Sequence, residues 1–374
     1  MAPSAPDLNI EPSKTTVDVR VIDTTVWISN LPIQTFIEQQ VKGFDKLDAP
    51  SFSFLVEHPS GRKLLFDLGV RKDWHNMSPY WHKLFEAAAA KIDIKHGVRE
   101  ILEEHGVPGS SIEAVVWSHW HMDHVGDPST FDPHTTLIVG PGFKEAMLPG
   151  YPANPDAPIL ESDYEGRELR EIKFDQGKKI GRFNAFDYFG DGSFYLLDTP
   201  GHAIGHLCAL ARVTTGADDG SSSFIFMAGD AAHHGGEFRP SKWLPLPESI
   251  SPHPLLDHHH HSSSSSSSSP GGAATPCPGE IFEKLLRDGD RTKPFFTIPK
   301  GTGTNNLDPE ETERTIEKLQ EADAHDKVFV VTAHDKDLLS IIDFFPKYAS
   351  DFASKDWVQR GRWAFLKDLK GAVE

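Results

Sequence analysis

The stretch Ser-His-Trp-His-Met-Asp-His at residues 118–124 constrains this chain more than any other segment. It follows the apolar run Ile112–Trp117, which has the composition of a buried strand. His119 and His121 alternate, so on an extended exit loop both imidazoles point the same way. A histidine-rich surface loop is the alternative interpretation. The spacing of three imidazoles and one carboxylate instead predicts a metal site, with zinc the first choice for such ligands.

Three later apolar runs end in residues that can also bind a metal. The run that ends at Leu197 leads through Asp-Thr-Pro-Gly to His202, and the run Phe224–Ala228 leads through Gly to Asp230. The run that begins at Val328 leads to His334. Open α/β architectures keep their sites beyond the carboxyl ends of strands, so we expect these side chains to meet in one place.

These motifs together resemble the metallo-β-lactamase superfamily over roughly residues 17 to 345. The resemblance rests on His-x-His-x-Asp-His at 119–124, Thr-Pro-Gly-His-x-x-Gly-His at 199–206, the Gly-Asp strand end and the late strand-end histidine. It implies two zinc ions per chain. One would be held by His119, His121 and His202, the other by Asp123, His124 and His334, with Asp230 bridging them.

Two neighbouring residues have supporting roles under the same resemblance. Asp67 ends the apolar strand Leu64–Phe66 and would orient the ligands as a second layer, with a loop cap as the alternative. His206 follows His202 by four residues and is expected to be structural, because relatives with unrelated substrates share this pattern.

The distribution of strands and helices predicts the fold class. We expect strands at residues 17–22, 25–28, 51–56, 63–66, 136–139, 170–174, 183–189, 193–197 and 207–213. We expect helices at residues 74–94, 98–104, 143–148, 281–287 and 309–322. Two β-rich runs, each followed by helices, fit an α+β protein with an αβ/βα four-layer sandwich.

Composition limits where such a protein works and what it binds. The net charge of −18 argues against nucleic acid as a partner. No apolar run reaches the roughly 18 residues that a membrane-spanning helix needs. Of two cysteines, Cys208 is expected in the core and Cys277 in a Pro-Gly-rich loop. They fit a reducing compartment, and we expect a cytoplasmic protein without a secretory signal.

Three segments stand apart from the predicted sandwich. Residues 1–16 are proline-rich and are expected to be a disordered N-terminal segment, leaving 17–374 as one domain. Residues of about 253–279, with four consecutive His and eight consecutive Ser, are expected to be a disordered, dispensable insertion. The aromatic residues of Asp343–Lys370 are expected to pack on the fold, with a homodimer interface as the alternative.

The chemistry expected of two adjacent metals is hydrolysis by a metal-activated water, with Asp123 able to pass a proton to the leaving atom. Within the superfamily, Asp rather than Cys at residue 230 departs from true β-lactamases, and His121 departs from flavodiiron proteins, which carry Glu there. Ribonuclease-type relatives are disfavoured by the acidic charge. Glyoxalase II-like thioesterases remain an alternative, although they usually have a Gly pair where this chain has Val125-Gly126-Asp127.

The motifs are most similar to N-acyl homoserine lactonases and to members that open lactams for detoxification. A small cyclic ester or amide is therefore the expected substrate. Many lactonases carry a substrate-facing Tyr three residues after the bridging Asp, where this chain has His233. His233 is a candidate catalytic hydrogen-bond or proton donor, with a solvated loop histidine as the alternative. A non-catalytic metal-binding protein of the same fold is the second hypothesis.

Overall fold

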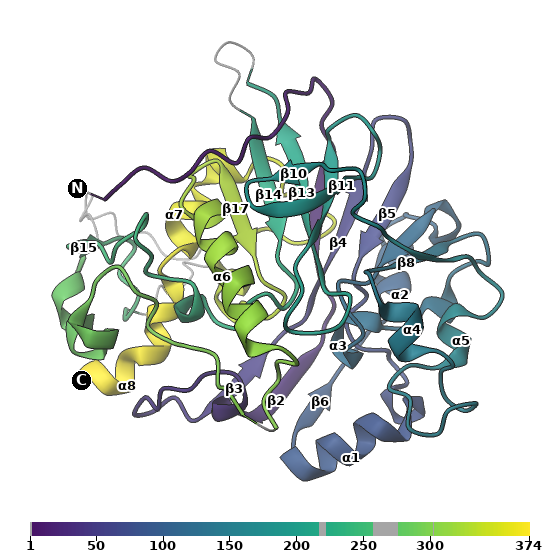
Figure 1. Ribbon diagram of the computed structural model, residues 1–374, viewed down its shortest axis with the longest axis horizontal. Helices are drawn as coiled ribbons and strands as arrows, with labels where there is room; N and C mark the ends of the chain where they lie inside the picture. Colours follow the sequence, from purple (N-terminus) through teal and green to yellow (C-terminus); the bar gives the residue numbers. More distant parts are fainter. Residues whose placement is uncertain (1, 217–221, 257–275, 302) are drawn as a thin grey trace, which may run out of the picture.

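The computed structural model describes residues 2–216, 222–256, 276–301 and 303–374. Two six-stranded mixed sheets form its centre (Figure 1). The first has the order β1 (Asp18–Asp23), β4 (Phe52–Glu57), β5 (Lys63–Phe66), β7 (Ala114–Val116), β8 (Thr136–Val139) and β9 (Leu169–Glu171). The second has the order β10 (Lys179–Ile180), β11 (Phe183–Asp187), β12 (Phe194–Asp198), β13 (Leu207–Thr214), β14 (Ser223–Met227) and β17 (Val328–Val331).

The pleat of these strands builds the layers. Along β4, Phe54 and Val56 enter the core between the two sheets, whereas Leu55 points to the other face. Along β12, Leu196 joins the same central core and Leu197 points outward. Both sheets are therefore apolar on both faces, and each outer face must be covered by helices.

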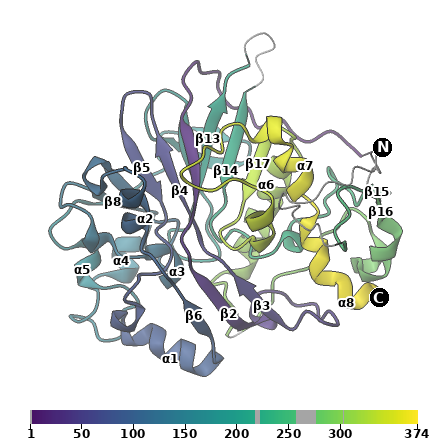
Figure 2. The same ribbon diagram turned by 180° about the vertical axis from the view of Figure 1, so that it is seen from behind.

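Helices cover each outer face, as Figures 1 and 2 show. The side of the first sheet carries α2 (Val98–Glu104), α3 (Met122–Val125), α4 (Phe143–Met147) and α5 (Glu161–Tyr164). The outer face of the second sheet carries α6 (Pro309–Asp323), whereas α7 (Trp357–Gly361) packs beside β17 with Trp357 and Val358 in the central core. The expected αβ/βα four-layer sandwich is confirmed. No helix in the described ranges is both long enough and apolar enough to cross a membrane.

The single helix predicted for residues 74–94 is wrong in its extent. Helix α1 spans only Pro79–Ala88, because Ser78 caps its first turn and Ala89 ends it in the left-handed conformation (φ 51°). The chain then forms β6 (Lys91–Asp93), which pairs with β2 (Trp27–Pro32) in a small sheet completed by β3 (Lys46–Ala49). This pairing joins segments about 60 residues apart, so local helical spacing could not show it.

The N-terminal segment differs from the disorder expected of residues 1–16. Residues 2–16 form no helix or strand, but Leu8 is buried against the outer face of the second sheet. The Leu8 carbonyl accepts the Gly181 N–H at 2.5 Å, and the Glu11 carbonyl accepts the Arg212 guanidinium at 2.6 Å. One apolar anchor and two hydrogen bonds order a stretch whose composition alone favours disorder.

The predicted insertion at about 253–279 lies largely outside the described residues, which omit 257–275. Its C-terminal edge is described and belongs to the fold. Cys277 and Pro278 form β16, which pairs with β15 (Ser249–Ile250), and Cys277 is fully buried. The boundary at 279 and the loop position expected for Cys277 are therefore corrected, because this thiol fills a small apolar core beside Ile250 and Phe282.

The aromatic C-terminal region packs on the fold, as expected. Phe352 and Trp357 enter the central core, and Trp363 and Phe365 enter the small core that contains Cys277. The chain ends in the short helix α8 (Lys370–Val373). These four rings are buried, so they supply no surface for a dimer.

The packing of Cys277 leads to a test of where the dispensable segment ends. Replacing residues 257–275 by a short Gly-Ser link should leave the melting temperature nearly unchanged, because the composition of this segment supplies no core. Extending the replacement through Pro278 should lower it by about 4 °C or more, since a buried side chain and a strand pair are lost at a cost of about 2 kcal/mol. Calorimetry on both variants checks this, and equal melting temperatures would contradict it.

Candidate metal centre

Five strands direct their carboxyl ends to one edge of the sandwich. In the first sheet β5 and β7 run parallel, and in the second sheet β14 and β17 do. Strand β12 has the same direction as β14, since each is antiparallel to β13. The loops after these strands carry Asp67, His119, His202, Asp230 and His334. The structure therefore brings the strand-end residues together at one edge, as the sequence predicts.

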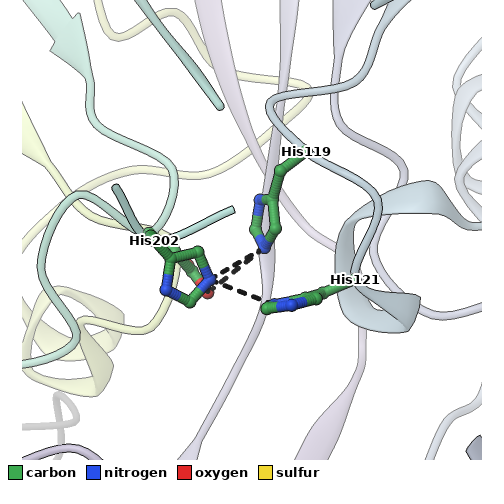
Figure 3. A group of neighbouring side chains, drawn as sticks. His119, His121 and His202 are labelled. Atoms are coloured by element: carbon green, nitrogen blue, oxygen red, sulfur yellow. Dashed lines mark hydrogen bonds and ion pairs between the residues drawn. The ribbon is translucent and has the colours of Figure 1, made fainter. Parts of the chain in front are cut away.

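Three imidazoles form the first group of potential ligands. His202 Nε2 lies 3.1 Å from His119 Nε2 and 3.0 Å from His121 Nδ1. Figure 3 shows His119 and His121, on the loop after β7, pointing toward His202. The carboxylate of Asp230 completes this group, with Oδ2 3.5 Å from His202 Nε2 and 3.7 Å from His119 Nε2.

The second group consists of Asp123, His124 and His334. His334 Nε2 lies 3.5 Å from Asp123 Oδ2, and His124 Nε2 lies 3.9 Å from Asp123 Oδ1. The other oxygen of Asp230 faces this group, with Oδ1 3.2 Å from His124 Nε2 and 3.1 Å from His334 Nε2. Asp230 therefore stands between the two groups and turns one oxygen to each.

Contacts on the far side of three of the imidazoles, those of His124, His202 and His334, set their orientation. His124 Nδ1 lies 2.8 Å from Asp67 Oδ2, and His334 Nδ1 donates to the Pro50 carbonyl at 2.7 Å. His202 Nδ1 lies 3.3 Å from the amide oxygen of Asn306. Each contact occupies Nδ1 and leaves Nε2 facing the centre, which is the arrangement that fixes metal-ligating histidines. The Asp67 contact corresponds to the orienting role expected for that residue rather than to a loop cap.

His206 has the structural role expected for it. It is fully buried, and its Nε2 accepts the backbone N–H of Asp230 at 3.1 Å, while Nδ1 donates to the Thr199 carbonyl at 3.0 Å. It thus holds the backbone of the central carboxylate. Gly229 stands beside it with φ 49°, and a Cβ there would lie 3.1 Å from the His206 ring, so only glycine fits this turn.

The two groups differ in their charge at neutral pH. Burial lowers the pKa of His119 and His202 well below the ordinary value, and it lowers the pKa of His121 to about 4. Burial also opposes protonation of His334, but Asp230 outweighs it and raises the pKa of His334 to about 9. For His124 the same balance, with Asp230 and Asp67 against burial, raises the pKa well above the ordinary value. The imidazoles of the first group are therefore neutral, whereas those of the second are protonated when no metal is bound.

The donor atoms suit metal ions. In the first group, lone pairs of neutral imidazoles converge at about 3 Å, where they repel each other unless a cation lies between them. In the second, His124 Nε2 and Asp230 Oδ1 are buried without a hydrogen bond among the described residues. Imidazole nitrogens and carboxylate oxygens are donors that divalent transition-metal ions accept in proteins. The His/Asp cluster therefore fits a metal site.

His233 lies beside the centre and is buried, so the interpretation as a solvated loop histidine is wrong. Its Nε2 is 3.2 Å from Asp230 Oδ2 and 3.0 Å from the amide nitrogen of Asn305. Its backbone N–H donates to the Glu237 carboxylate at 3.2 Å. Burial raises the pKa of Glu237, although His233 and its backbone N–H oppose this shift.

The sequence did not indicate Glu237, Asn305 or Asn306. The two asparagines come from the loop before α6, about 70 residues beyond His233, and no ligand-like pattern surrounds them. Glu237 follows His233 by four residues in a short 3-10 turn (Gly235–Glu237), and that spacing was the only local signal.

A cavity of about 590 Å³ opens over the two groups. His121, Asp123, Asp230, His233 and His334 form its polar floor. Outside the ligand loops its walls come mainly from β2 with the turn after it, helix α1 and residues 303–307, and Leu47 and Ala49 of β3 add to them. The cavity is large enough for a small-molecule substrate in contact with both groups.

Comparison with known proteins places this arrangement in a family. The family model for the metallo-beta-lactamase superfamily matches residues 48–214. Gamma-lactamase FDB1 of Fusarium pseudograminearum (strain CS3096) is 42% identical over 371 residues, covering 97% of this chain and 85% of that protein. Gamma-lactamase MBL2 of Gibberella moniliformis is 45% identical over 258 residues, covering 68% of this chain and all (100%) of that protein.

A solved structure of an N-acyl homoserine lactone hydrolase with its product at the catalytic metal center has the same fold. It covers 90% of this chain and 100% of its own, with a TM-score of 0.54 at 17% identity. At that identity the likeness concerns the fold alone. The sequence relatives, the family model and the His/Asp cluster agree, so the chain belongs to the metallo-β-lactamase superfamily and is a metal-dependent hydrolase.

Proposed function

We propose that this protein is a dinuclear zinc hydrolase that opens a small lactam or lactone. The observation that carries the proposal is the position of Asp230, whose two oxygens face two separate groups of ligand-type side chains. The names of the two gamma-lactamase relatives support a lactam, and the fold of the lactone hydrolase supports a lactone. A role in detoxification or secondary metabolism fits either ring.

The ligand residues would form two metal sites that share one carboxylate. His119, His121 and His202 would hold one ion, Asp123, His124 and His334 the other, and Asp230 would join them. Two divalent ions at such a centre supply an activated water at neutral pH and polarise the scissile carbonyl. The imidazoles of the first group are neutral, whereas those of the second would release protons when metal binds. The Nδ1 contacts of His124, His202 and His334 hold these three rings in position.

Asp123 and His233 are the candidates for moving protons. Asp123 has 18% of its side chain accessible, and it lines the cavity. It is therefore able to carry a proton from the water to the leaving atom. His233 lies near Oδ2 of Asp230, whereas His124 lies near Oδ1, and the Asn305 amide nitrogen beside His233 Nε2 can only donate to that atom. His233 would therefore act as a donor once Nε2 carries a proton in place of the Asn305 contact, and it would then donate to the carbonyl or to the leaving nitrogen or oxygen.

The first test combines metal analysis with a screen of lactams, lactones and thioesters. The parent protein should hold two zinc ions at saturation and hydrolyse a lactam or lactone. His121→Ala and Asp230→Ala should each lose metal and about 10³-fold or more in kcat/KM, because metal polarisation is worth several kcal/mol and each 1.4 kcal/mol is tenfold. One ion at saturation, with Asp230→Asn unchanged, would contradict the dinuclear site. Turnover of thioesters alone would favour the glyoxalase II-like alternative, and no turnover with two ions bound would favour the non-catalytic one.

The second test uses the different charge of the two groups. Below pH 9 an ion entering the second group must displace protons from His334 and His124, so its affinity falls about tenfold per pH unit for each proton displaced. The three-histidine group has no proton to displace at pH 6, because the pKa of His121 is about 4 and those of its partners are also lowered. Protein dialysed against a fixed, low concentration of free zinc should therefore hold two ions at pH 8 and one at pH 6.

His121→Ala is the matched control for this pH experiment, since it leaves only the second group intact. That variant should lose its remaining ion between pH 8 and pH 6. Metal content after dialysis measures both proteins. Two outcomes would contradict the assignment of neutral imidazoles to the first group and protonated imidazoles to the second. One is that the parent loses both ions over the same pH range. The other is that the ion remaining at pH 6 is lost in His334→Ala and kept in His121→Ala.

The third test addresses His233. His233→Ala should lower kcat by about 10²-fold while both ions remain bound, because a positioned donor contributes about that factor. His233→Tyr should recover activity on lactones, since a phenol can donate from the same place, and His233→Phe should not. A larger loss on lactams than on lactones would fit the greater need of a leaving nitrogen for a proton. Equal kcat/KM in all four proteins would end the proposal for this residue.

A further inference from the structure

The cavity over the metal centre has apolar walls. Leu31 and Phe36 line one side, Trp81, Leu84 and Phe85 of α1 line another, and Leu307 lies on the rim. Leu84 and Leu307 are among the most exposed large apolar side chains of the described residues, at 47% and 58%. An apolar surface therefore runs from the floor of the cavity to its mouth.

The polar groups of these walls are uncharged. Tyr80, Thr35, Thr304 and Asn305 contribute hydroxyl and amide groups. Such groups offer hydrogen bonds to a neutral molecule without adding a charge to the lining.

Lysine and arginine are missing from the described lining of this cavity. Composition does not explain this, because the chain has 37 Lys and Arg in total. A second cavity, beside α2, is lined by Arg71, Lys72 and Arg99, and all three are paired with carboxylates. Among the described lining residues, Asp123 and Asp230 are the only carboxylic acids, and the whole chain carries a net charge of −18.

An anionic group on a substrate would be unfavourable in this cavity. A carboxylate attached away from the reacting carbonyl would lie against apolar walls with no cation to pair with, and it would lose its hydration. Bound directly at the metal ions, it would take the place of the scissile carbonyl and act as an inhibitor instead. A neutral molecule with an apolar body has neither problem and gains from burial against the aromatic walls.

We propose that the substrate is an uncharged lactam or lactone with an apolar body that packs against the cavity walls. This inference rests on the proposed function and specifies the class of molecule that the same site takes. It excludes anionic thioesters, including those of glutathione, which carry two carboxylates. Selection is exerted by the walls, from β2, α1 and residues 303–307, and not by the metal-binding residues.

The experiment compares substrates that differ in one charge. Aryl-substituted γ-lactam and γ-lactone rings are prepared with either a carboxamide or a carboxylate on the aryl group. On the zinc-loaded parent, kcat/KM for the carboxamide should exceed that for the carboxylate by about 100-fold or more, the cost of an unpaired buried charge. Leu84→Arg adds a cation at the cavity mouth and should shift this ratio at least about tenfold toward the carboxylate.

Leu339→Arg is the matched control. Leu339 is an exposed leucine of similar accessibility, in the 3-10 turn Lys336–Ser340 and outside the cavity lining. This variant adds the same charge to the protein and should leave the ratio at the parent value. Equal kcat/KM for carboxamide and carboxylate on the parent would overturn the inference, and so would equal shifts in the two variants.

A binding measurement separates this inference from the proposed reaction. Trp81 and Trp120 line the cavity, so quenching of tryptophan fluorescence reports binding without turnover. If neither ring is hydrolysed but the carboxamide binds at least about 100-fold more tightly than the carboxylate, the proposed reaction fails and the inference about the cavity stands. If the two bind equally, the inference fails whatever the turnover.

Discussion

The buried carboxylate of Asp230 is the group on which the rest of the site depends. Both of its oxygens are surrounded by imidazoles, with His124 and His334 near Oδ1 and His119 and His202 near Oδ2. Burial alone would raise the pKa of Asp230, but His124 and His334 hold it well below the ordinary value. An ionised carboxylate without a counter-charge is too costly at this depth, so the fold must supply cations here, as protons or as metal.

Holding that carboxylate requires both halves of the sandwich. The first sheet supplies Asp67 behind His124, and the second supplies the β14 loop with Asp230 and the β17 loop with His334. His334 reaches back to the Pro50 carbonyl, just before β4 of the first sheet. Metal binding is therefore linked to the packing of the two sheets, since ions that bind only the assembled site stabilise the folded state.

Most of the metal-ligand residues could be predicted from the sequence, because they occur at characteristic spacings just after apolar strands. The ligand residues follow strands whose apolar runs are visible, and Val98–Glu104 and Lys63–Phe66 end where their patterns end. What could not be predicted depends on distant contacts. Strand β6 forms because it pairs with β2. Leu8 is ordered because it is buried in a core formed by other segments, and Asn306 becomes part of the site because it contacts His202. The local sequence does not indicate which distant segment a residue will contact.

The same division explains why the motifs indicate the reaction better than the substrate. The residues that bind metal lie in loops whose spacing is readable, but the cavity walls come from β2, α1 and residues 303–307. Their Leu, Phe and Trp side chains look like ordinary core residues in sequence, and only their position beside the ligand groups makes them a binding surface. Apolar walls also exclude water, which strengthens every interaction between the charged floor and a bound carbonyl. Specificity and rate therefore have a common physical source: a small polar centre at the base of a cavity that offers no other charge.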